Sequence, residues 1–190
     1  AKGVWNDIPL LYHTIVNTTG FVRLGDASAA VNLTRNGTRV SNGTGSTILN
    51  DTILLAAGIY QYNVTYWESQ NYSAKNVSKI LNMEKAQTVA TLWLNESNAN
   101  RDYNRSEWIN ATGYLSTPAG FFSWETKLLN LTFNYTQTYS ANYTAAGVMT
   151  GANNTIYNIT SNDVPGAYNF TLWFAGDQNY SDTSTSRIAS

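Results

Sequence analysis

Triplets of the form Asn-x-Ser/Thr are the residues of this sequence whose type and spacing could undergo chemistry. An oligosaccharyltransferase transfers sugar to the amide nitrogen of such an asparagine when x is not proline. The 190 residues include 24 Asn and 40 Ser plus Thr, for which chance placement gives about 5 triplets. The chain holds 18, at Asn17, Asn32, Asn36, Asn42, Asn50, Asn63, Asn71, Asn76, Asn95, Asn104, Asn110, Asn130, Asn134, Asn142, Asn153, Asn158, Asn169 and Asn179. This excess predicts a chain that carries many covalent N-linked glycans.

Other chemistries have little support in the composition. There is no cysteine and one histidine, so a disulfide framework, a thiol nucleophile and a thiolate metal site are excluded. Charged residues make up 12% and the net charge is -1, which offers no basic patch for nucleic acid. We find no phosphate loop, calcium loop or apolar run of membrane-spanning length. We therefore expect no enzyme, no metal or other cofactor, and no nucleic-acid partner.

The elements that must position these asparagines repeat along the chain. Residues 58–80 return at 166–188 without a gap, at an offset of 108. In each copy a glycine precedes a run in which aromatic or aliphatic residues alternate with other residues, as Tyr60-Gln61-Tyr62 does. A period of two predicts a strand with one face on the core. A polar turn, the letters NYS and a second candidate strand follow, so each copy predicts a β-hairpin.

These hairpins resemble the last hairpin of the immunoglobulin-like repeats of microbial, notably archaeal, surface proteins. The segments LAAGIYQYNVTYWESQNYS and VPGAYNFTLWFAGDQNYS carry the resemblance. In the first copy Trp67-Glu68-Ser69 replaces the family-like Ala175-Gly176-Asp177, so we expect a different turn there. The resemblance implies an all-β chain of two tandem immunoglobulin-like antiparallel β-sandwiches, set on a cell surface, and it implies no reaction.

The remaining segments divide into two modules, 1–83 and 84–190. A polar, sequon-rich insertion around 137–161 distinguishes the second module, because the offset between the copies grows from 98 to 108 across it. We expect it to form a glycan-bearing loop or an added hairpin. Alternating and β-branched residues predict strands, and Gly, Ser, Thr and Asn between 40 and 50 predict a turn region. The expected strands cover 14–24, 29–38, 88–94, 108–115, 121–124 and 128–135, and residues 52–57 lead into the first hairpin.

One strand has no full counterpart in the first module. The second module opens with a strand at 85–94, and an offset of 93 places its equivalent mostly before Ala1. Either the segment around 3–8 serves as a shortened strand, or the module lacks it and exposes an apolar groove. A strand from another chain can fill such a groove. The donor-strand residues that we expect at the subunit interface are Val4, Trp5, Ile8 and Leu10.

Two further residue sets suggest chemistry. Trp67 and Trp173 fall on the outward face of their strands, where they could stack on a surface carbohydrate or pack beneath glycans or at subunit contacts. Lys–Asn cross-links occur in similar-looking surface sandwiches, and the possible lysines are Lys2, Lys75, Lys79, Lys85 and Lys127. No motif selects one of them.

Three functional hypotheses follow. The first is a structural subunit of an extracellular, heavily glycosylated filament, which polymerises with copies of itself. In composition and sequon density the chain resembles the subunits of the archaeal thread-type pilus. The purpose of the filament would be adhesion or surface attachment. The second is an immunoglobulin-like segment of a longer surface layer or adhesin array. The third is a carbohydrate-binding module that uses the exposed tryptophans.

Overall fold

The computed structural model describes residues 9–117, 128–135, 142–148, 155–161 and 166–190 of the chain. All regular elements in these ranges are β-strands, fourteen in number. The chain divides into two compact parts, unit 1 (1–86) and unit 2 (87–190). Their boundary lies three residues beyond the expected one at 83/84.

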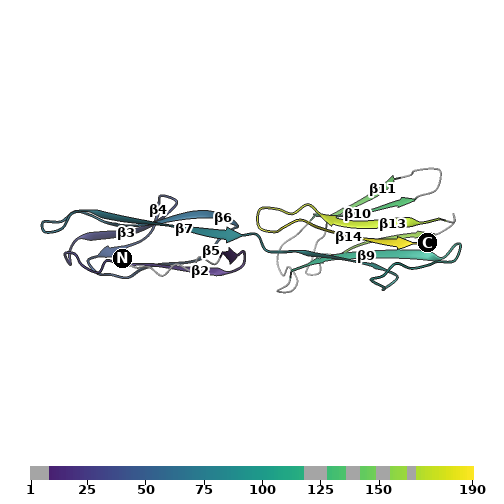
Figure 1. The fold of residues 1–190 in the computed structure, drawn as a ribbon, viewed down its shortest axis with the longest axis horizontal. Helices are drawn as coiled ribbons and strands as arrows, with labels where there is room; N and C mark the ends of the chain where they lie inside the picture. The colour runs from purple at the N-terminus through teal and green to yellow at the C-terminus, as the bar shows by residue number, and fades with distance from the viewer. Residues whose placement is uncertain (1–8, 118–127, 136–141, 149–154, 162–165) are drawn as a thin grey trace. The chain divides into compact units, whose positions relative to one another are not determined.

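Unit 1 is a sandwich of two sheets (Figure 1). One sheet has the order β1-β7-β6-β3-β4, and the opposite layer consists of β2 and β5 alone among the described residues. All pairs are antiparallel except β1 with β7. The strands are β1 (Leu10–Leu11), β2 (Ile15–Gly20), β3 (Ala30–Arg35), β4 (Thr38–Thr44), β5 (Leu49–Leu54), β6 (Gly58–Tyr66) and β7 (Lys75–Glu84).

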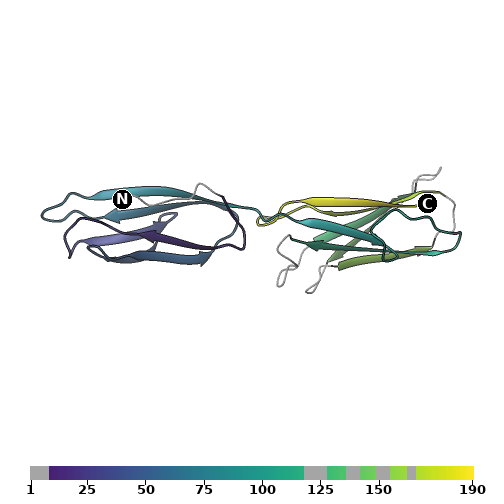
Figure 2. The same cartoon turned by 60° about the horizontal axis from the view of Figure 1, so that its bottom comes forward.

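Unit 2 has a similar arrangement of strands, with no described counterpart of β1 in the first layer and one more strand, β8, in the second (Figures 1 and 2). Its sheets have the orders β11-β10-β13-β14 and β12-β9-β8. The strands are β8 (Val89–Leu94), β9 (Trp108–Ser116), β10 (Leu128–Tyr135), β11 (Asn142–Val148), β12 (Thr155–Ser161), β13 (Tyr168–Phe174) and β14 (Thr183–Ala189). Strands β2 to β7 therefore correspond in pairing to β9 to β14.

The alternation of the sequence explains the core. In β6 the aromatic rings of Tyr62 and Tyr66 are buried, while Gln61 points outward. In β13 the side chains of Phe170 and Leu172 are buried in the same way. Aromatic and aliphatic side chains from both sheets fill the space between the layers, as in other β-sandwiches. The expected fold class, two tandem immunoglobulin-like antiparallel sandwiches, is confirmed.

The repeated hairpin is conserved in its details between the two units. Gly58 has φ 154° and Gly166 has φ 153°, a backbone conformation that residues with a Cβ rarely adopt. The turn after the strand closes with a hydrogen bond from Ser69 N to Tyr72 O at 2.9 Å, and the second copy repeats it from Asp177 N to Tyr180 O at 3.1 Å. The turn closure that we expected to differ is therefore shared. In the first copy the Ser69 hydroxyl accepts a hydrogen bond from Tyr72 N. In the second copy the Asp177 carboxylate accepts the equivalent bond from Tyr180 N.

One expectation about loops was too broad, and another was wrong. The turn in the region 40–50 is confined to 45–48, because β4 runs to Thr44 and β5 begins at Leu49. The segment 137–161 is neither a polar loop nor an added hairpin, because it contains β11 and β12, which pair with β10 and β9 in opposite sheets. The connections before, between and after β11 and β12 are each longer than those around β4 and β5, and they account for most of the additional residues. The expected strand at 121–124 lies outside the described residues.

Candidate functional site: an open groove in unit 1

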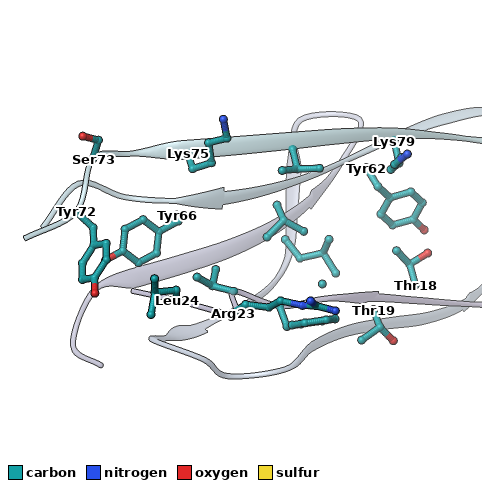
Figure 3. Close-up of a pocket in the computed structure, with 16 residues that line it drawn as sticks. Thr18, Thr19, Arg23, Leu24, Tyr62, Tyr66, Tyr72, Ser73, Lys75 and Lys79 are labelled. Carbon is teal, nitrogen blue, oxygen red and sulfur yellow. The ribbon is translucent and has the colours of Figure 1, made fainter. Parts of the chain in front are cut away.

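A groove of about 370 Å³ opens between the two sheets of unit 1. The end of β2 and the loop after it form one wall, and β6 and β7 with their turn form the other (Figure 3). The lining residues are Thr18, Thr19, Gly20, Phe21, Val22, Arg23, Leu24, Leu33, Tyr62, Val64, Tyr66, Tyr72, Ser73, Lys75, Val77 and Lys79.

The floor of the groove is apolar and its rim is basic. Leu33, Val64 and Val77 contribute aliphatic side chains, and Leu33 is fully buried beneath them. Exposed Lys75 and Lys79 lie on one rim in Figure 3, with Arg23 across from them. Among the described residues, no carboxylate lines the groove. The arrangement suits an extended segment that presents apolar side chains inward at every second position.

Both strands that border the groove have open edges in the described residues. β2 pairs with β5 on one side and with no described strand on the other. β7 pairs with β1 only at Met83 and Glu84, so its outer edge from Lys75 to Asn82 has no strand partner there. Unpaired backbone N–H and C=O groups on such edges are a template for another strand.

Unit 2 shows what fills the equivalent place. There β8 pairs with β9 between Ala111 and Ser116. Residues of β9 correspond to residues of β2 that lie 93 positions earlier, so 111–116 correspond to 18–23. Residues 18–23 line the groove of unit 1. In β8 the side chains of Leu92 and Leu94 are fully buried. The groove of unit 1 is therefore the site of the strand that β8 provides in unit 2.

A hydrogen-bonded network supports one end of the groove. The Asp51 Oδ2 atom on β5 accepts from Arg35 Nη1 at 2.5 Å and from the Tyr62 hydroxyl at 2.9 Å. Tyr62 is 2% exposed, and this burial raises the pKa of its hydroxyl above the ordinary value. The pKa of the Arg35 guanidinium is also raised, against the effect of its burial, by its interactions with Tyr62 and Asp51. The network has no signature in the sequence, because its members come from three separated strands.

The expected donor-strand residues divide into two groups. Leu10 lies in β1, pairs with Met83 of its own unit and packs against the core of that unit. The Tyr12 backbone continues the attachment with a hydrogen bond to Glu84 O at 2.9 Å. Leu10 is thus held within its own unit and does not reach outward. Val4, Trp5 and Ile8 lie outside the described residues.

None of the sequon asparagines whose side chains are described is buried. Eight are exposed, namely Asn17, Asn36, Asn42, Asn50, Asn71, Asn76, Asn104 and Asn110. Six are half-buried, namely Asn32, Asn63, Asn95, Asn130, Asn169 and Asn179. The side chains of Asn134, Asn142, Asn153 and Asn158 lie outside the described set.

Several of these asparagines share one face. On the larger sheet of unit 1, Asn32 in β3 is directly opposite Asn42 in β4 and opposite Thr65 in β6. Thr65 is in turn opposite Asn76 in β7. Because residues opposite one another point to the same side of a sheet, Asn32, Asn42 and Asn76 lie on one outer face.

Asn95 differs from the others in its contacts. Its Nδ2 donates to Trp108 O at 2.9 Å and its Oδ1 accepts from Asn110 N at 2.6 Å. Its φ of 44° is left-handed. The side chain thus fixes the connection between β8 and β9, and this sequon has a structural use of its own.

The other proposed chemical groups are dispersed. Lys75, Lys79 and Lys85 are exposed, and Lys2 and Lys127 lie outside the described residues. Within the described ranges, no three His, Cys, Asp or Glu side chains gather as metal ligands would. A search of the same ranges finds no helix with the length and apolar character of a membrane span.

No protein-family model matches the sequence, and no curated protein matches it. Among solved structures, the fibronectin(III)-like modules of CbhA from Clostridium thermocellum match 96% of this chain and 90% of their own. The sequence identity is 12% and the TM-score is 0.37. The strand topology described above establishes each unit as a β-sandwich of the immunoglobulin and fibronectin type III kind.

Proposed function

We propose that this protein is a structural subunit of an extracellular, heavily N-glycosylated cell-surface filament of archaeal type, a pilus that serves adhesion or surface attachment. Its copies are joined by strand exchange, in which an extended N-terminal segment of one copy occupies the groove of another. The proposal assigns no catalytic role, and covalent N-linked glycans are the only non-protein groups in it. The single observation that carries it is the open groove of unit 1.

The occupant of the groove is the segment 1–8 of a second copy. This segment leads through Pro9 directly into β1, which is already seated beside the end of β7. Eight extended residues span about 26 Å, enough for a six-residue strand like β8. Alternation places Val4 and Ile8 on the inward face and Trp5 on the other. The carboxylate of Asp7 complements the basic rim of Arg23, Lys75 and Lys79.

Exchange between copies is favoured by the hinge. Pro9 is the one residue between the segment and β1, and its ring fixes φ near -65°. Short, stiff hinges favour exchange of an element between protomers over its return to the same protomer. If each copy gives its segment to the next and the contact does not close on itself, the result is a fibre.

The surface of the molecule suits an extracellular position. Every described sequon side chain is at least partly exposed, on edges and outer faces of both units. Glycans there would cover sheet edges that otherwise invite aggregation. The low content of charged residues leaves few surface ion pairs that could cover these edges instead.

Electron microscopy of native material secreted without denaturant tests the proposal. Regular thin fibres that are lost when residues 1–8 are deleted are the expected result. Dispersed particles, or a flat lattice that persists after the deletion, would contradict it. Those outcomes would favour the second hypothesis, a segment of a longer surface layer or array, which the tandem arrangement of two like units also fits.

A further inference from the structure

All four tryptophans that the structure describes are at the surface. Trp67 is 55% exposed, Trp93 37%, Trp108 64% and Trp173 40%. The cores of both units use Leu, Tyr, Phe, Ile and Val instead. Large aromatic side chains at the protein surface expose apolar area to water, and such exposed area often marks a site that another group covers. What these four share is a neighbouring sequon.

In unit 1 the neighbour of Trp67 is Asn32. The Asn32 amide, oriented to satisfy both of its groups, accepts a hydrogen bond from Trp67 Nε1 at 3.0 Å and donates to Val31 O at 3.2 Å. The Trp67 backbone is fixed beside the same strand by a bond from its N–H to Ala30 O at 3.1 Å. The indole is thus held against the amide that would carry the sugar.

In unit 2 each of the three described tryptophans also lies beside a sequon. Trp173 in β13 is directly opposite Asn130 in β10, the residue that an offset of 98 equates with Asn32. Directly opposite side chains have Cβ atoms about 5 Å apart. Trp108 lies two residues before Asn110 on the same face of β9. Trp93 is directly opposite Thr112, the third residue of the Asn110 sequon.

We propose that these indole rings are platforms for the protein's own glycans, with the first sugar of the chain on Asn32, Asn110 and Asn130 lying on Trp67, Trp108 and Trp173. One face of a pyranose ring presents C–H groups, which pack on an aromatic face. A stacked sugar removes exposed indole surface from water and restricts the glycan at its root. This inference rests on the glycosylation that forms part of the proposed function.

The positions of the four rings favour stacking on the protein's own glycans over a binding site for free carbohydrate. Such a site gathers several aromatic and polar groups in one concave place. Here Trp67 follows β6 in one sheet of unit 1, while Trp108 and Trp173 belong to β9 and β13, which lie in different sheets of unit 2. Trp93 and Trp108 share the Asn110 sequon, whereas Trp67 and Trp173 lie beside Asn32 and Asn130. None of the four lines the groove of unit 1.

The test uses the full glycosylated chain from a host that glycosylates it. Peptide mass spectrometry first measures occupancy at Asn32, Asn110 and Asn130. NMR then records the sugar protons in the wild type and in Trp67→Leu and Trp67→Phe variants. We expect an upfield ring-current shift of protons on the first sugar at Asn32, which is reduced by the Phe variant and lost in the Leu variant.

A thermal cycle adds a second readout. Thr34→Val removes the Asn32 sequon with a residue of the same shape, and it should lower the melting temperature by about 4 °C with Trp67 present. In the Trp67→Leu background the same change should shift it by about 1 °C or less. The matched control is Thr38→Val, which removes the Asn36 sequon at the far end of β3 from Trp67 and should give the same shift in both backgrounds.

The outcomes are distinguishable. Unmodified asparagines at all three positions would overturn both this inference and the glycosylation in the proposed function. Occupied asparagines whose sugar protons show no ring-current shift, with equal thermal effects in both Trp67 backgrounds, would overturn the platform alone. An interaction of Trp67 with added free oligosaccharide that survives removal of the Asn32 sequon would assign the ring to a carbohydrate receptor instead.

Discussion

Deletion of residues 1–8 is the perturbation that bears most directly on the groove. The deletion keeps Pro9 and β1, and it removes no sequon. It removes only the segment that we place in the groove of another copy. Filaments should fail to form, and unit 1 should become less stable than it is within the filament.

The magnitude follows from the strand that fills the same place in unit 2. There Leu92 and Leu94 are fully buried. Full burial of one such aliphatic side chain stabilises a protein by about 1.5–3 kcal/mol. Val4 and Ile8 together should therefore contribute about 3–6 kcal/mol, a large part of the roughly 5–15 kcal/mol that stabilises a typical domain. We expect the melting temperature of unit 1 to fall by about 10 °C or more.

A synthetic peptide of residues 1–9 should reverse the loss. Added to the shortened chain at 100 times its dissociation constant, it contributes about 2.7 kcal/mol, or about 10–20 °C for a domain of this size. Differential scanning calorimetry over a peptide titration measures the shift. The matched control is the peptide with Val4→Asp and Ile8→Asp, which keeps the length and places charge on the inward face.

The reasoning would be refuted by a shortened chain that melts within about 2 °C of the full one and does not respond to the peptide. An equal response to the control peptide would also count against it. In that case charge attraction to the basic rim, and not burial in the groove, would account for binding.

Four further results are expected. Gly113→Ala should destabilise unit 2 by about 1–3 kcal/mol in denaturant titrations, because a Cβ there would lie 2.7 Å from Leu172 side-chain carbons. Gly20→Ala should cost less, because the side chain that it would press borders the open groove. Asn95→Ala should destabilise unit 2 by about 1–2 kcal/mol through its two lost hydrogen bonds to backbone, and equal stability would contradict its structural role. The raised pKa of Tyr62 gives stability that is complete below its unfolded pKa near 10 and is lost as the pH rises through the folded pKa. Tyr62→Phe should therefore flatten the decline of stability above pH 10, and an unchanged alkaline limb in circular dichroism would oppose this.

The parts of the fold that follow from the sequence are those with one buried face. β6 and β13 alternate because their sheet covers a core on one side only, and the repeat revealed them together with their glycines. β4 was not foreseen, because it is an edge strand with no buried side chain and therefore has no apolar period. In the same way the polar residues of β11 and β12 were interpreted as a loop or an added hairpin.

The site was only partly accessible from the sequence. The offset between modules indicated where a first strand was missing, and the groove lies there. The basic rim was not foreseen, because Arg23 comes from the loop after β2 and Lys79 from β7, and the sequence does not tell which charged residues face an unfilled gap. The relation of tryptophans to sequons needed the pairing register, since Trp173 and Asn130 are 43 positions apart in the sequence.

The central claim is that the groove of one copy holds the segment 1–8 of another. Because the chain has no cysteine, single cysteines at Val4, Asn6 or Ile8 in one population can be mixed with Lys79→Cys chains in a second, before assembly under oxidising conditions. The account predicts disulfide-linked pairs that contain one chain of each kind, identified by mass spectrometry. It would be contradicted if mixed pairs are absent while chains that carry both cysteines form the bond within themselves, since the segment then occupies the groove of its own chain.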